Sequence, residues 1–199
     1  MKLERRGKKV IVRPYKPTDY EAWKRAQGCS HLKRSNKWDS ARRPDPSELT
    51  KSKFNKILKS QKKNRDKDYF YDFGIFLKDG TLVGGVSIMD ISRQVFQNAY
   101  LGYRIYNIYW GKGYGSEGVQ LALDIAFKDL KLHRLEAGIE PTNRRSIALA
   151  RKIGLKKEGF SKARLFLRNK WLDMTLYVAR SEDFGIVWKP TKEKKMVRF

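Results

Sequence analysis

The stretch from Tyr109 to Gly118 reads Y-W-G-K-G-Y-G-S-E-G and contains four glycines in ten residues. Directly after it, apolar residues recur at helical spacing from Val119 to Leu130. Glycines allow backbone N–H groups to converge, and the first turn of a helix adds partial positive charge. The stretch therefore predicts an anion site suited to a pyrophosphate, with Lys112 supplying charge at its rim.

Several phosphate-binding patterns compete for this stretch. The Walker A string G-x-x-x-x-G-K-[ST] does not occur in the sequence. Gly113 to Gly118 matches G-x-G-x-x-G, and with Val119 it also matches the glycine-loop string of kinases. Both matches are weak, because a dinucleotide fold needs the motif after the first strand of a βαβ unit and no other kinase segment is present. A glycine-rich turn that only reverses the chain is a further alternative.

Two segments together resemble a known family. Trp110 to Gly115 resembles the coenzyme A loop [R/Q]-x-x-G-x-[G/A] of the GNAT N-acetyltransferases, with Trp110 where Arg or Gln is usual. Asn143 to Gly159 is similar to the N-x-x-S…K-x-G-F-x-x-E-G stretch of the RimJ/RimL-like subgroup, which acetylates the N-termini of ribosomal proteins. Leu155 replaces the usual Phe there. The resemblance also covers Leu101–Ile105 and Lys170–Asp173, and spans about residues 8–180.

The resemblance implies acetyl-CoA as cosubstrate. Backbone groups of the strand before the loop would hold the pantetheine arm and the acetyl carbonyl, and the loop would hold the pyrophosphate. The implied cofactor-binding residues are Tyr103, Arg104, Ile105, Trp110, Gly111, Lys112, Gly113, Tyr114, Gly115, Ser116 and Asn143. Asn143 can equally serve only as a helix cap, and Tyr103 and Ile105 can also pack in the core.

Catalytic side chains are harder to identify than the cofactor loop. Many members of the superfamily place a Tyr on the later helix to protonate the leaving thiolate, but Ala150 occupies that place. The resemblance to the RimL-like subgroup implies Ser146 in this role. Asp72, Asp90 and Glu140 are candidate general bases, although each can equally be a solvated side chain.

The pKa of the acceptor amine decides how strong a base the site needs. An α-amino group has a pKa of ~7.7–8.0 and a lysine side chain one of ~10.4. Freeing the neutral amine at pH ~7 therefore costs about 1 kcal/mol for the first and about 4.6 kcal/mol for the second. A site without an obvious strong base favours an α-amine.

The elements that must position these residues follow from periodicity and turn signals. We predict strands at 8–14, 68–78, 81–91, 99–105, 133–140, 160–168 and 171–180. We predict helices beginning at Pro17, over 47–64, over 115–130 and after Asn143, and a long loop over 31–46. This order predicts an α+β fold with three layers, in which helices cover both faces of a mixed, mostly antiparallel sheet.

Length and composition limit the protein class. The 199 residues suit one domain, which we place at 1–183, followed by a basic C-terminal tail at 184–199. One Cys and two His argue against disulfides and a metal centre. The sequence has neither a membrane-length apolar run nor an N-terminal secretory pattern, so the cytoplasm is the expected location. The oligomeric state stays open.

The charge points to polyanionic partners. Lys and Arg number 45 against 21 Asp and Glu, a formal net charge of +24. Such a chain is attracted to RNA or to a ribosome surface. The leading hypothesis is an N-acetyltransferase acting on the N-terminus of a protein, with ribosomal proteins as the expected acceptors. The alternatives are an acetyltransferase for a small-molecule amine such as an antibiotic, and a non-catalytic RNA-binding module. Basic–aromatic stretches at Trp23–Arg25 and Lys37–Trp38 could serve the RNA-binding module.

Overall fold

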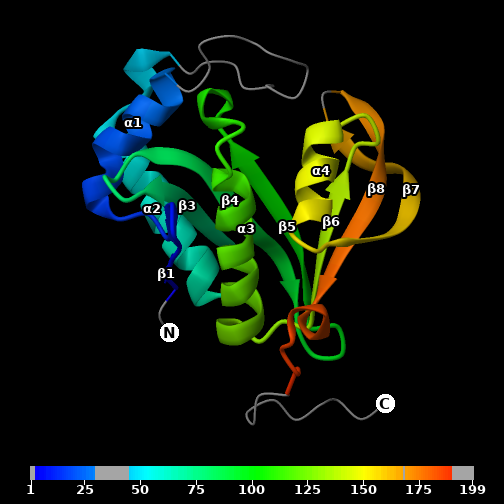
Figure 1. The fold of residues 1–199 in the computed structure, drawn as a ribbon. Coiled ribbons are helices and arrows are strands. Elements are labelled where there is room, and N and C mark those ends of the chain that lie inside the picture. The colour runs from blue at the N-terminus through cyan, green and yellow to red at the C-terminus, as the bar shows by residue number, and fades with distance from the viewer. Residues whose placement is uncertain (1–2, 30–44, 168, 190–199) are drawn as a thin grey trace.

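The computed structural model describes residues 3–29, 45–167 and 169–189. Its strands are β1 (Arg5–Arg6), β2 (Val10–Arg13), β3 (Tyr71–Leu77), β4 (Leu82–Ser92), β5 (Asn98–Ile105), β6 (Arg134–Ile139), β7 (Lys156–Leu167) and β8 (Lys170–Arg180). Its α-helices are α1 (Tyr20–Cys29), α2 (Lys51–Asp66), α3 (Tyr114–Asp124) and α4 (Arg144–Lys152). In Figure 1, α3 and α4 lie side by side over one face of the sheet.

The described strands form one sheet in the order β1-β2-β3-β4-β5-β6-β8-β7. Every neighbouring pair is antiparallel except β5 and β6, which run parallel. A parallel pair needs a long crossover, and here α3 and the short π-helical segment Ile125–Asp129 that follows it lie within that crossover. The predicted mixed, mostly antiparallel sheet is confirmed.

Alternation along the strands places a core on each face of the sheet. Ile75 and Val83 belong to the larger core, which also contains residues of α3 and α4. Phe76 and Leu82 belong to a second core with residues of α1 and α2, in which Phe54 is fully buried. Apolar side chains on both faces must be covered by helices. The three-layer α+β architecture predicted from the sequence is therefore confirmed.

The first two helices begin later than the sequence pattern indicated. Pro17–Asp19 forms a separate 3₁₀ turn before α1, and Pro46–Glu48 forms another before α2. The Thr50 hydroxyl then caps α2 by accepting from the Lys53 amide at 3.1 Å. The predicted start of α2 at residue 47 was therefore wrong by four residues. The Thr50 cap fixes the first residue of the helix, whereas the apolar pattern already begins before that cap. The predicted 31–46 loop lies almost wholly outside the described residues.

The second half of the chain follows the predicted order. Asn143 caps α4, and Gly154, with φ of +89°, follows its last turn. The strand predicted from Phe160 begins at Lys156, and bulges interrupt its pairing with β8. None of the described helices is both long and apolar enough to cross a membrane.

The segment after β8 is partly attached to the core. The Phe184 ring packs 5.6 Å from that of Phe127, and Trp188 Nε1 donates to the Lys131 carbonyl at 2.9 Å. The residues after 189 lie outside the described part of the chain. The domain boundary at residue 183 stays a prediction.

Candidate active site

The sheet opens between its two parallel strands. The pairing of β5 with β6 consists of Asn98 with Arg134, Ala99 with Leu135 and Tyr100 with Glu136. Beyond that last pair, β5 continues to Ile105 and β6 to Ile139. The five residues of β5 after Tyr100 therefore keep β4 as a neighbour but have no partner strand on the β6 side. We call this opening the fork.

Backbone alternation decides which groups face the fork. The Tyr106 amide donates to the carbonyl of Val83, near the start of β4. In an antiparallel pair, alternate residues direct their N–H and C=O groups to the same neighbour. Tyr103 and Ile105 therefore direct their backbone groups into the fork, whereas the amide of Arg104 faces β4. Of the three strand residues predicted to contact the cofactor, two offer backbone donors to the fork.

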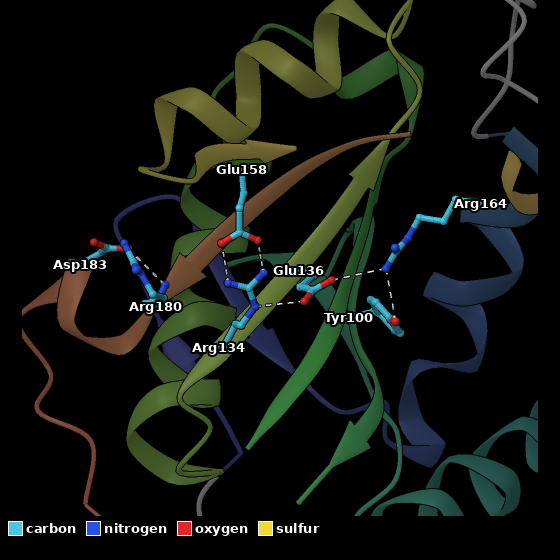
Figure 2. Close-up of polar contacts among 7 residues, drawn as sticks. All are labelled: Tyr100, Arg134, Glu136, Glu158, Arg164, Arg180 and Asp183. Atoms are coloured by element: carbon cyan, nitrogen blue, oxygen red, sulfur yellow. Dashed lines mark hydrogen bonds and ion pairs between the residues drawn. The ribbon is translucent and has the colours of Figure 1, made fainter. Parts of the chain in front are cut away.

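A polar network joins the strands at the closed end of the fork, near the last pair of β5 and β6 (Figure 2). Arg134 Nε donates to one oxygen of Glu136 at 3.0 Å, and Arg164 Nη2 approaches the other at 3.4 Å. Arg164 also reaches the Tyr100 hydroxyl at 3.4 Å, and Arg134 also binds Glu158 of β7. These contacts link β5, β6 and β7 across the sheet face opposite α4. The strands are thus joined at the last pair and separate beyond it.

The glycine loop lies where β5 ends and α3 begins. Gly111 and Gly113 have φ of +78° and +81°, a region that strains other residues. None of the described residues accepts a hydrogen bond from the backbone N–H groups of Gly111 to Ser116. The first three residues of α3 supply half of these free donors. Unpaired donors at a helix N-terminus suit an anion.

Close packing fixes the loop against the strand and α4. A Cβ atom added to Gly115 would lie 2.9 Å from Leu149 Cδ1 and 3.0 Å from Ile105 Cγ1. On the other side of the loop, Lys9 Nζ donates to the Lys112 carbonyl at 3.1 Å. The loop is therefore held between Ile105 and Leu149 on one side and Lys9 on the other.

Trp110 has a role that the sequence did not reveal. Its indole Nε1 donates to the Ile105 carbonyl at 2.8 Å, which caps the last backbone acceptor of β5. The Arg145 guanidinium of α4 lies 4.2 Å from the Trp110 ring centroid. This stacking places a cation against Trp110, the residue directly before the free amides of the loop. Arg145 is absent from the predicted site because nothing in a single sequence relates positions 110 and 145.

Asn143, Ser146 and Tyr103 meet at the first turn of α4. Asn143 Oδ1 accepts from the Ser146 amide at 3.2 Å, so Asn143 acts as the predicted helix cap. The Tyr103 hydroxyl lies 2.9 Å from Ser146 Oγ and 3.2 Å from the Ser146 carbonyl oxygen. Burial raises the pKa of Tyr103, and the hydrogen bond with Ser146 partly opposes that shift. The predicted catalytic serine thus lies over the fork with a phenol beside it.

The candidate bases differ in their surroundings. Asp72 on β3 accepts a 2.6 Å hydrogen bond from the Ser87 hydroxyl. Burial raises the pKa of Asp72, with hydrogen bonds from Ser87 and Gln61 opposing it. Asp90 is exposed, and the Glu140 carbonyl accepts from the Asn143 amide. Within the described residues, no group of three or more His, Cys, Asp or Glu side chains could hold a metal ion.

The fork and the loop fit the chemistry of an acyl-coenzyme A. Such a molecule carries a diphosphate, which needs converging donors, and an amide-containing arm, which can pair with free strand backbone. The loop from Gly111 to Ser116 offers the first, and Tyr103 and Ile105 offer the second. A mixed sheet forked beside a helix N-terminus, with helices on both faces, defines the class of the N-acetyltransferases that take their acyl group from coenzyme A.

The particular family is shown by comparison with known proteins. The family model described as an acetyltransferase (GNAT) domain matches residues 9–156. The chain is 36% identical over 169 residues to the probable N-acetyltransferase YjcK of Bacillus subtilis (strain 168), covering 84% of this chain and 92% of that protein. The chain belongs to the GNAT family of N-acetyltransferases. Such enzymes use acetyl-CoA.

Two solved structures extend the comparison. The ribosomal-protein-S5-alanine acetyltransferase of Vibrio fischeri superimposes with a TM-score of 0.75 at 25% identity, covering 94% of this chain and 99% of that one. RimJ of Mycobacterium smegmatis, solved in complex with CoA-disulfide, superimposes with a TM-score of 0.72 at 25% identity, covering 87% of this chain and 83% of that one. The chain is thus similar to ribosomal-protein acetyltransferases over most of its length.

Proposed function

We propose that this chain transfers the acetyl group of acetyl-CoA to the N-terminal α-amine of a protein, with ribosomal proteins as the first acceptors to test. The observation that carries the proposal is the fork: β5 and β6 separate after Tyr100 and Glu136, and β5 leads on into a loop with unpaired amides. The acceptor class is supported by the similarity to an enzyme that acts on the alanine of ribosomal protein S5.

The residues of the chain divide the work as follows. Amides of the loop from Gly111 to Ser116 bind the diphosphate, and Arg145 adds charge beside them. The Tyr103 and Ile105 amides hold the arm and stabilise the oxyanion that forms when an amine attacks the thioester. Ser146 donates its hydroxyl proton towards the leaving sulfur. Acetyl-CoA supplies the activated acyl group.

An α-amine is favoured over a lysine as the acceptor because none of the candidate bases is well placed to remove a proton at the fork. Asp72, the candidate base whose pKa is raised by burial, already accepts from Ser87, and β4 separates its strand from β5. An α-amine needs only ~1 kcal/mol to reach its neutral form at pH ~7, so water can remove its proton. A lysine would need a stronger base at the fork.

The two alternatives receive less support. Trp23, named above as a candidate RNA-stacking residue, is only 6% exposed and packs 5.2 Å from the Phe54 ring. It therefore belongs to the core, and Lys37–Trp38 lies outside the described residues. An acetyltransferase for small-molecule amines shares the whole coenzyme side of the site and is separated from our proposal only by the acceptor.

Mass spectrometry tests the proposal directly. The purified chain and acetyl-CoA are incubated with a peptide that begins with alanine and contains an internal lysine. We expect one acetyl group on the α-amine. The matched control is the same peptide with a blocked N-terminus, which should stay unmodified. Acetylation of the lysine alone, or of an aminoglycoside and no peptide, would contradict an Nα-acetyltransferase.

A further inference from the structure

The contact between Tyr103 and Ser146 joins two parts of the site that the sequence assigned to separate roles. Tyr103 was predicted to act through its backbone and Ser146 through its hydroxyl. In the structure, the Tyr103 side chain packs against the larger core on the α4 side, and its hydroxyl lies 2.9 Å from Ser146 Oγ. The strand that offers the amides thus also contacts the catalytic serine.

The backbone of Ser146 is held in place independently of this contact. Asn143 Oδ1 accepts from its amide, which holds the first turn of α4. That cap leaves the Ser146 hydroxyl free to rotate, and a serine hydroxyl has one donor and two acceptor positions. Without a further contact, its proton could point back to a backbone carbonyl rather than into the fork.

The Tyr103 phenol can remove this freedom. Burial raises its pKa, so the phenol remains a proton donor at neutral pH. Its single proton lies within reach of two acceptors, the Ser146 carbonyl oxygen at 3.2 Å and Ser146 Oγ at 2.9 Å. When the phenol donates to Oγ, the nearer of the two, the serine proton must point elsewhere. Tyr103 belongs to the β5 segment that lacks a β6 partner, so its phenol places Ser146 Oγ within hydrogen-bond reach of the strand that borders the fork.

We infer that Tyr103 is a positioning residue, whose hydroxyl orients Ser146 so that the serine proton is directed at the sulfur of the acetyl donor. This inference rests on the proposed function. In the transfer, the amine lone pair forms the C–N bond and the C–S bonding pair leaves with sulfur. The nitrogen loses one proton and the sulfur gains one, so protons balance. Ser146 passes its hydroxyl proton to the departing sulfur and is reprotonated by water that carries the proton lost by the nitrogen, and Tyr103 acts only through Ser146.

A double-mutant cycle tests this role. Tyr103→Phe, Ser146→Ala and the double variant are assayed with acetyl-CoA and the alanine peptide. We expect kcat to fall roughly tenfold in Tyr103→Phe, as for loss of one hydrogen bond, and roughly 100-fold in Ser146→Ala. The double variant should be no slower than Ser146→Ala. KM for acetyl-CoA should stay unchanged, because the Tyr103 backbone is intact.

Two further measurements separate positioning from a loss of structure. Tyr71→Phe, on β3, removes another part-buried phenol hydrogen bond, the one to Asp68 at 3.0 Å, and should keep full kcat. In ¹³C-tyrosine NMR, Ser146→Ala should move the Tyr103 phenol to a higher pKa, because its hydrogen bond with Ser146 lowers that pKa. A Tyr103 pKa that stays the same in Ser146→Ala would contradict the contact in solution.

The outcomes distinguish this inference from the proposed function. If Tyr103→Phe matches the wild-type kcat, or if the two losses multiply in the double variant, the positioning role is wrong while acetyl transfer stands. If calorimetry finds no binding of coenzyme A to the wild-type chain, the proposed function itself fails.

Discussion

At the scale of single residues, the site depends on glycines that no other residue can replace without strain. Gly113 has φ of +81° at the N-cap of α3, with only Lys9 Nζ near a would-be Cβ, at 3.5 Å. The space is therefore open, and the requirement is conformational. An L-residue in the left-handed region costs about 1–2 kcal/mol.

Gly113→Ala should lower the free energy of unfolding by about 1 kcal/mol and weaken coenzyme A binding several-fold, since any relaxation moves the loop amides. Gly80→Ala is the matched control: it has φ of +88° in the β3–β4 turn and nothing within 4 Å. Denaturant unfolding should give similar losses for both variants, and calorimetry should show weaker binding only for Gly113→Ala. Equal affinities would contradict a role for the loop in binding.

Arg145 makes the second residue-scale prediction. Arg145→Ala should weaken coenzyme A binding roughly tenfold, because a hydrogen bond to a charged group is worth about 1.5–3 kcal/mol. The loss should shrink at high salt. Arg151→Ala, in the last turn of the same helix, is the control and should bind normally. A similar loss in both variants would show a general charge effect instead of a placed guanidinium.

At the scale of elements, ion pairs fix where helices begin and how the late strands associate. Asp19 accepts both guanidinium nitrogens of Arg13, at 2.6 and 2.8 Å, and also the Lys16 amide at 2.7 Å. The Arg13 and Asp19 side chains are only 13% and 9% exposed. One carboxylate therefore joins the end of β2 to the turn that starts α1.

Asp19→Ala should destabilise the protein by about 3–5 kcal/mol, because it leaves the Arg13 charge buried and unpaired. Thermal unfolding measures the loss. Asp66→Ala, which removes an exposed pair with Lys62, should change stability by less than about 1 kcal/mol. Comparable losses in the two variants would contradict a special role for the Arg13–Asp19 pair.

The network around β6 predicts a dependence of stability on pH. The hydrogen bonds from Arg134 lower the pKa of Glu158, and that from Lys156 lowers the pKa of Asp183. Because these folded-state pKa values lie below the unfolded ones, the unfolded state binds more protons in this range. Their stabilisation is thus present above pH ~4.3 and is lost as the pH falls further.

Thermal unfolding between pH ~6 and ~3 should show a smaller fall in Tm for Glu158→Gln than for the wild type. The control is Glu21→Gln on α1, because Glu21 makes no ion pair with any described residue. Parallel curves for the wild type and Glu158→Gln would exclude the Arg134–Glu158 pair as a source of the pH dependence.

At the scale of the whole molecule, the net charge of +24 sets the long-range behaviour. It gives attraction to polyanions without selecting a sequence. RNA binding measured by fluorescence anisotropy should therefore weaken at least tenfold between ~50 and ~200 mM salt. A poly-glutamate competitor serves as the control and should displace the RNA. Salt-independent binding would indicate a specific RNA site instead of diffuse attraction.

The local pattern of residues in the sequence determined most of the secondary structure and the coenzyme loop. The glycine stretch before an apolar helix, the Asn143 cap and the order of strands and helices depend on neighbours within a few residues, so the sequence predicts the α+β fold and the coenzyme loop. The sequence predicted the starts of α1 at Tyr20 and α2 at Lys51 less well, because caps and 3₁₀ turns override the apolar pattern.

Only the tertiary structure decided which residues meet across the site. The fork after Tyr100 arises from the pairing of strands separated by a helix, and strand register is a long-range property. The contacts of Arg145 with Trp110 and of Tyr103 with Ser146 join α4 to β5 and its loop, more than 30 residues away. Such contacts leave no periodic signal in one chain, because packing between elements, and not spacing within them, brings the side chains together.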